Sequence, residues 1–188
     1  MLQREPEALK WRFCFSRPCC MSPLSDAASV QLCRADYQLP AHAQALVFLL
    51  DAYARDVAGG GQPLSEFAKQ HLVAELAARP QAFSVLAFDG VQPVGLVNCI
   101  EGFSTFACKP LVNVHDVVVL ASYRGRRVGQ QMLALVEQLA RERGACKLTL
   151  EVLAGNRSAM SLYERVGFAG YQLDPAMGQA QFLQKWLA

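Results

Sequence analysis

The stretch VVVLASYRGRRVGQQML, residues 117–133, decides the predicted fold of this chain. An apolar run typical of a buried strand leads into a polar turn with three arginines and two glycines, and a helical pattern follows at once. The first amides of a helix have no partner within the helix and carry about half a positive charge. A strand, a cationic turn and a helix start in this order therefore predict a phosphate-binding site.

The patterns around this stretch predict a single α/β domain with a mixed sheet. Alternation and apolar runs predict strands at 30–37, 83–88, 92–107, 111–120 and 145–153, and a final strand pair at 168–173 and 180–187. Helical periodicity and caps predict helices at 41–58, 64–79, 127–143 and 157–166. Because a helix connects strands 111–120 and 145–153, these strands should be parallel, with a right-handed crossover.

Composition narrows the classes of protein. The 188-residue chain is 53% hydrophobic and 18% charged, which is typical of a globular domain. Its formal net charge is only +2, so we expect no nucleic-acid-binding surface. No apolar stretch approaches the roughly 18 residues that a membrane-spanning helix needs, so we expect no membrane segment.

The cysteines and the first residues of the chain favour a cytoplasmic domain. Seven cysteines at scattered positions favour free thiols in a reducing compartment, with a redox or metal-binding role for Cys19 and Cys20 as the alternative. The three histidines have no zinc-ligand spacing, so we expect no metal. Residues 1–28 have no sustained period and are predicted to be a poorly ordered extension before a domain at 29–188. Met21 is a candidate for the true start.

A second motif, EVLAGNRSAMSLYERVGF, occupies residues 151–168. Asn156 is a natural helix cap, and Tyr163 follows it by about two helical turns on a similar face. Taken alone, these residues predict a cap and a half-buried packing side chain.

Together the two motifs resemble those of the GNAT superfamily of N-acetyltransferases. The family's phosphate motif, Arg/Gln-x-x-Gly-x-Gly/Ala, reads here Arg124-Gly125-Arg126-Arg127-Val128-Gly129, with Arg127 in place of a glycine. The family's later motif, Asn-x-x-Ala-x-x-Leu-Tyr-x-x-x-Gly-Phe, is matched throughout by Asn156, Ala159, Leu162, Tyr163, Gly167 and Phe168. The predicted helix 127–143 gives Arg127 helical φ/ψ, in which a side chain is tolerable. That side chain would either crowd the pyrophosphate or add a phosphate contact, and we favour the contact.

The resemblance implies a GNAT fold, with a mixed sheet of six to seven strands, a splayed parallel pair and about four helices. It implies that acetyl-CoA, without a metal, binds where strands 111–120 and 145–153 separate. Tyr163 would protonate the departing thiolate, and a backbone N–H near Val118 would stabilise the oxyanion. The implied cofactor-binding residues are Val117, Val118, Val119, Arg124, Gly125, Arg126, Arg127, Val128, Gly129, Gln130, Asn156 and Tyr163.

Two adjacent residues compete for the role of general base. His115 has an ordinary pKa near 6.5, which suits a base at neutral pH, and Asp116 is the alternative. Adjacent strand residues point to opposite faces, so only one should face the acceptor unless a bulge intervenes. Asp116 is expected to share the face of Val114 and Val118. We favour His115 narrowly.

The resemblance does not name the acceptor, which is a primary amine of a small molecule or of a protein. The helices 41–58 and 64–79 and the segment 101–109 are expected to surround it. The candidate acceptor-binding residues are Tyr53, Arg55, Glu66, Phe103, Ser104 and Thr105. A catalytically silent acyl-CoA sensor is the alternative function, and edge strands near the C-terminus are compatible with a homodimer.

Overall fold

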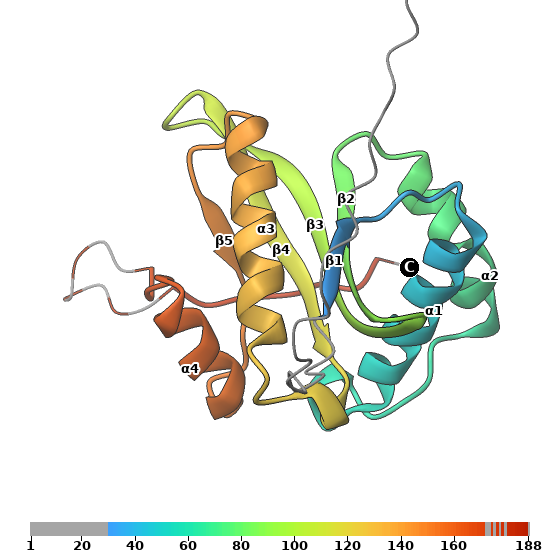
Figure 1. Ribbon diagram of the computed structural model, residues 1–188. Coiled ribbons are helices and arrows are strands. Elements are labelled where there is room, and N and C mark those ends of the chain that lie inside the picture. The colour runs from blue at the N-terminus through green and yellow to red at the C-terminus, as the bar shows by residue number, and fades with distance from the viewer. Residues whose placement is uncertain (1–29, 172–173, 175, 177, 179, 188) are drawn as a thin grey trace, which may run out of the picture.

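A computed structural model describes residues 30–171, 174, 176, 178 and 180–187 (Figure 1). Its five strands are β1 (Gln31–Arg34), β2 (Ala82–Asp89), β3 (Gln92–Ser104), β4 (Lys109–Val119) and β5 (Leu148–Leu150). Four α-helices lie in the same part of the chain: α1 (Pro40–Arg55), α2 (Glu66–Ala77), α3 (Val128–Glu142) and α4 (Arg157–Arg165). The described residues also form two short 3-10 helices, η1 (Val57–Gly59) and η2 (Ala121–Tyr123). The predicted α/β class, mixed sheet and number of helices are confirmed. The predicted extension and Met21 lie outside the described residues.

The strands follow one another across the sheet in the order β1-β2-β3-β4-β5. All neighbours are antiparallel except β4 and β5, which are parallel as predicted. Helix α3 covers one face, and α1 and α2 cover the other (Figure 1). Successive side chains of β2 point to opposite faces of the sheet, so the two faces carry separate cores. Val85 and Ala87 pack on the α3 side, and Leu86 packs on the α1 side.

The predicted final strand pair is wrong. Residues 168–171 and 180–187 form no strand, and residues 172–173 lie outside the described residues, so the described sheet has five strands and not six to seven. Alternation can define two faces of a segment, but a strand also needs a hydrogen-bonding partner. The open edge of β5 is only three residues long, and an isolated strand pair is marginal in water. Trp186 is accordingly 87% exposed.

The parallel pair separates soon after it forms. Only Val112–Val114 of β4 pair with Leu148–Leu150 of β5, whereas β4 continues to Val119. Beyond Val114, no strand in the described part of the chain therefore pairs with β4 on its β5 side. This separation is the splay that the family resemblance implies.

A bulge in β4 changes the direction of its side chains. Asn98 of β3 lies opposite Asp116, but the next residue, Cys99, lies opposite Val114, so His115 is the extra residue. Val114 consequently packs in the α3 cluster and Val118 in the α1 cluster. The expectation that Asp116 shares a face with both valines is wrong, because the bulge resets the alternation.

Within the described ranges, every helix is too short or too polar to cross a membrane.

Candidate active site

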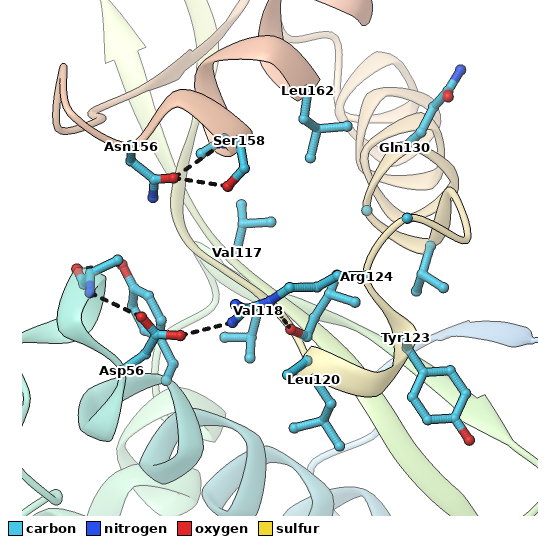
Figure 2. Close-up of a pocket in the computed structure, with 18 of the residues that line it drawn as sticks. Asp56, Val117, Val118, Leu120, Tyr123, Arg124, Gln130, Asn156, Ser158 and Leu162 are labelled. Carbon is cyan, nitrogen blue, oxygen red and sulfur yellow. Dashed lines mark hydrogen bonds and ion pairs between the residues drawn. The ribbon is translucent and has the colours of Figure 1, made fainter.

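A groove with a volume of about 750 Å³ opens where β4 and β5 separate (Figure 2). One side is the end of β4, and the other sides are the turn before α3, the first turn of α3, helix α4, and the end of α1 with η1. Every residue predicted to contact the cofactor lines this groove except Arg126. The lining residues from that set are Val117, Val118, Val119, Arg124, Gly125, Arg127, Val128, Gly129, Gln130, Asn156 and Tyr163.

The start of α3 presents its backbone amides to the groove. The first backbone hydrogen bond of α3 is donated by the Gln131 amide to the carbonyl of the N-cap residue, Arg127, at 3.0 Å. The amides of Val128, Gly129 and Gln130 precede that bond, and no side chain among the described residues caps them. The first turn also contains no acidic residue. The helix dipole therefore favours an anion here.

Gly129 allows α3 and α4 to approach each other closely. A Cβ atom on Gly129 would lie 2.9 Å from Leu162 Cδ2, which is closer than real Cβ contacts. Leu162 immediately precedes Tyr163 on α4. The missing side chain thus sets the spacing between the exposed amides of α3 and the helix that carries Tyr163.

Arg127 does not have the predicted helical φ/ψ. It is the residue before α3, with φ of 62° and ψ of 13°, in the left-handed region. This conformation suits the glycine that the family motif has at the same position and is unfavourable for arginine. The turn keeps the backbone path of the family motif at a cost in strain.

Replacement of Arg127 by glycine is expected to stabilise the fold. The left-handed conformation costs an ordinary residue about 1–2 kcal/mol, and the added freedom of glycine in the unfolded chain offsets part of the gain. We expect the free energy of unfolding in urea to rise by about 0.5–1 kcal/mol. Arg126→Gly is the matched control, because Arg126 is not at positive φ and should gain nothing. Equal changes in both variants would contradict the strain at Arg127.

The three arginines of the turn have different surroundings. Arg124 donates to Asp56 Oδ2 at 2.8 Å and to the Val119 carbonyl at 3.1 Å, so its side chain crosses the groove towards η1 (Figure 2). Arg126 instead stacks on the Tyr123 ring, with its guanidinium carbon 4.8 Å from the ring centre. An anion in the groove would therefore meet Arg127 directly and would compete with Asp56 for Arg124.

Asn156 and Tyr163 lie on the far wall. Asn156 caps α4, and its Oδ1 accepts from the Ala159 amide at 3.2 Å and from the Ser158 hydroxyl at 3.1 Å. The predicted cap is confirmed. Tyr163 is 9% exposed and packs edge-on against Phe168. Burial, with a smaller contribution from Tyr53, raises the pKa of Tyr163 to about 12, so its hydroxyl keeps its proton at neutral pH.

A second cavity, of about 360 Å³, lies between the sheet and helices α1 and α2. Its lining residues are Leu50, Tyr53, Ala54, Gly59, Leu64, Leu72, Leu76, Asn98, Ile100, His115 and Asp116. Tyr53 lines both this cavity and the groove. The two spaces are therefore neighbours, with Tyr53 at their junction.

The bulge brings both base candidates to this cavity, where an ideal strand would present only one. His115 Nδ1 lies 3.4 Å from Asp116 Oδ1. The hydrogen bond that the His115 ring donates to the Asp116 carboxylate is the main cause that raises the pKa of His115 above its ordinary 6.5. A carboxylate beside Nδ1 favours the tautomer with its proton on Nδ1, in which Nε2 is the acceptor.

A chain of side-chain hydrogen bonds holds Asp116 in place. Asn98 Nδ2 donates to Asp116 Oδ2 at 3.0 Å, and the Ser84 hydroxyl donates to Asn98 Oδ1 at 2.6 Å. The hydroxyls of Tyr37 and Ser84 are 2.9 Å apart. Sequence reasoning missed Asn98 and Ser84, although a polar residue within each of two apolar strands is a signal for buried hydrogen bonding.

Five predicted acceptor-binding residues lie outside both cavities. Arg55 pairs with Asp51, and Glu66 pairs with Lys69 in the first turn of α2. Phe103, Ser104 and Thr105 lie at the far end of the β3–β4 hairpin, where the Ser104 hydroxyl accepts from a local amide. The hairpin extends away from α1 and α2, so only Tyr53 of the six lies where it was expected.

The described residues hold no group of three metal-ligating side chains. Their four cysteines, Cys33, Cys99, Cys108 and Cys146, are free thiols.

The fold and the groove define the class of protein, and comparison with known proteins agrees. Residues 46–168 match the model of the acetyltransferase (GNAT) family, and the chain belongs to that family. It is 35% identical over 89 residues to streptothricin acetyltransferase of Streptomyces lavendulae, covering 46% of this chain and 47% of that protein. It is 28% identical over 90 residues to N-alpha-acetyltransferase 30 of Schizosaccharomyces pombe, covering 48% and 59%. The chain thus spans about half the length of these relatives.

Solved structures share the fold. A probable acetyltransferase has a TM-score of 0.69 at 21% identity, covering 84% of this chain and 99% of that one. Aminoglycoside N-acetyltransferase AAC(6')-Iy, in complex with CoA, has a TM-score of 0.67 at 17% identity, covering 88% and 99%.

Proposed function

We propose that this protein transfers an acetyl group from acetyl-CoA to a primary amine. The proposal rests on three features that lie next to one another. They are the unpaired amides at the start of α3, the unpaired stretch of β4, and the cavity that His115 and Asp116 line. Tyr53 lines both spaces, so a donor in the groove and an acceptor in the cavity would meet beside it.

The groove fits coenzyme A by its donor set. The amides of the first turn of α3 and the side chain of Arg127 are suited to the diphosphate. The free backbone edge of Val117–Val119 is suited to the amides of the pantetheine arm, in the manner of an added strand. Acetyl-CoA would supply a thioester that an amine can attack directly.

The protein's own groups would accept one proton and share a second in a hydrogen bond. His115 Nε2 would accept the proton of the incoming ammonium, with Asp116 stabilising the imidazolium that forms. Tyr163 would donate a hydrogen bond to the departing sulfur. Since its pKa is about 12 and that of a thiol is about 8.5, full proton transfer from Tyr163 is unfavourable and stabilisation by the hydrogen bond dominates.

Replacement of Tyr163 by phenylalanine tests this assignment. We expect kcat to fall about 10- to 100-fold, less than the roughly 100- to 10,000-fold that a full proton donor contributes, because the proton is only partly transferred. The dissociation constant of CoA should stay unchanged, since the ring remains. Tyr171→Phe is the matched control, because Tyr171 is 64% exposed and lines neither cavity.

The measurement is release of free thiol from acetyl-CoA with a panel of primary amines, beside calorimetry with CoA. Thiol release that depends on an amine supports the transferase. Binding of CoA without turnover of any amine would favour an acyl-CoA sensor, and absence of CoA binding would refute the proposal.

A further inference from the structure

We infer that the acceptor is a small primary amine with one positive charge and an apolar body, of the alkylamine or arylalkylamine class. The inference concerns the cavity beside His115 and Asp116 and rests on the proposed function, because it assumes that the groove holds the acetyl donor.

The walls of the cavity are aliphatic. Helix α1 contributes Leu50, α2 contributes Leu72 and Leu76, and β3 contributes Ile100. All four side chains are only half-buried, although they face the interior between the sheet and the helices. An apolar body in the cavity would remove this surface from water, which favours binding.

The cavity offers one carboxylate to a cation. Among the described residues that line it, Asp116 is the only acidic one, and Tyr53 and Asn98 are uncharged. The nearby Asp51 of α1 is paired with Arg55 at 2.9 Å and lies 3.7 Å from Lys69. A polycation would leave all but one of its charges without a partner against leucine side chains, which is costly.

The position of that carboxylate is fixed. Asn98 is 5% exposed and Ser84 is fully buried, and their hydrogen bonds hold Asp116 beside His115. An ammonium that pairs with Asp116 would lie next to the base, and its apolar substituent would extend along Leu72 and Leu76. A volume of about 360 Å³ lies within the range of about 300–1,000 Å³ typical of small-molecule sites, so we commit to a small molecule.

The first experiment compares acceptors with the full-length protein and saturating acetyl-CoA. Hexylamine and 2-phenylethylamine represent the proposed class, spermidine and kanamycin represent polycations, and a short peptide with an apolar N-terminal residue represents proteins. We expect kcat/KM for the apolar monoamines to exceed the others by about tenfold or more, because each unpaired ammonium costs desolvation. A preference for a polycation or for the peptide would overturn the inference and leave the transferase proposal intact.

The second experiment places a charge in the wall. Leu76→Lys should weaken calorimetric binding of hexylamine to the CoA-saturated protein by about tenfold, because an ammonium in the wall repels the ligand's own ammonium and disfavours its apolar body. The affinity for CoA should not change. Leu39→Lys is the matched control, since Leu39 is 47% exposed and lies outside the cavity. Unchanged hexylamine binding in Leu76→Lys, or no hexylamine binding to the original protein, would overturn the inference, whereas absence of CoA binding to the original protein would refute the proposed function itself.

Discussion

Replacement of Gly129 by valine is expected to weaken coenzyme A binding by about 100-fold or more. The physical reason is local: a Cβ at this position would lie 2.9 Å from Leu162 Cδ2 and 3.7 Å from Val119 Cγ2. Leu162 could turn aside, but Leu162 and Val119 both line the groove, so the branched side chain would occupy the space that the first amides of α3 face. Loss of two charge-assisted hydrogen bonds, each worth about 1.5–3 kcal/mol, corresponds to an effect of this size.

A matched substitution separates cofactor binding from general destabilisation. Gly144 follows the other end of α3, at φ of 73° and with open space around its Cβ position. Gly144→Val should therefore lower the free energy of unfolding through backbone strain and leave CoA affinity unchanged. Calorimetry with CoA, on variants whose circular dichroism shows them folded, gives the comparison. A folded Gly129→Val protein with the original affinity would show that the amides of α3 do not hold the diphosphate.

The fold was predictable where sequence signals are local and repeated. The helical stripes of α1 and α3, the alternation in β2 and the order around residues 117–133 depend on neighbours within the same element. The prediction of a final strand pair was wrong because a strand needs a neighbouring strand to hydrogen-bond with. The alternation at 180–187 does not show that the neighbouring strand, β5, is only three residues long.

The site was predictable in its backbone parts and less so in its side chains. The motif at 124–129 defined the helix start, but it suggested the wrong φ for Arg127, because strain is tolerated where the rest of a turn fixes the path. The acceptor cavity depends on which residues of α1, α2 and β3 meet, so Leu72, Leu76 and Asn98 carried no signal for it individually. The bulge at His115 is likewise invisible without the register of β3.

Because the bulge brings both His115 and Asp116 to the cavity, either residue could be the general base. The two assignments predict different effects of substituting each residue. If His115 accepts the proton, Asp116 raises the pKa of its imidazole and orients it. If Asp116 accepts the proton directly, His115 is a neighbour that lines the cavity. The exposure of the His115 side chain, 64% against 20% for Asp116, favours the first assignment, because an incoming amine reaches the imidazole more easily.

Replacement of His115 by glutamine is then expected to lower kcat/KM by about 100- to 10,000-fold, the usual contribution of a positioned base. CoA affinity should stay unchanged. The matched control is His71→Gln, at a histidine of α2 that hydrogen-bonds to the Phe67 carbonyl, and it should have little effect.

The pH profile of Asp116→Asn supplies the second measurement. The base must be unprotonated, so activity rises with pH through the His115 pKa. Because the hydrogen bond from His115 to the Asp116 carboxylate raises that pKa above 6.5, the activity of Asp116→Asn should rise at a lower pH than that of the original protein. Near-normal activity in His115→Gln together with loss of activity in Asp116→Asn would instead identify the carboxylate as the base.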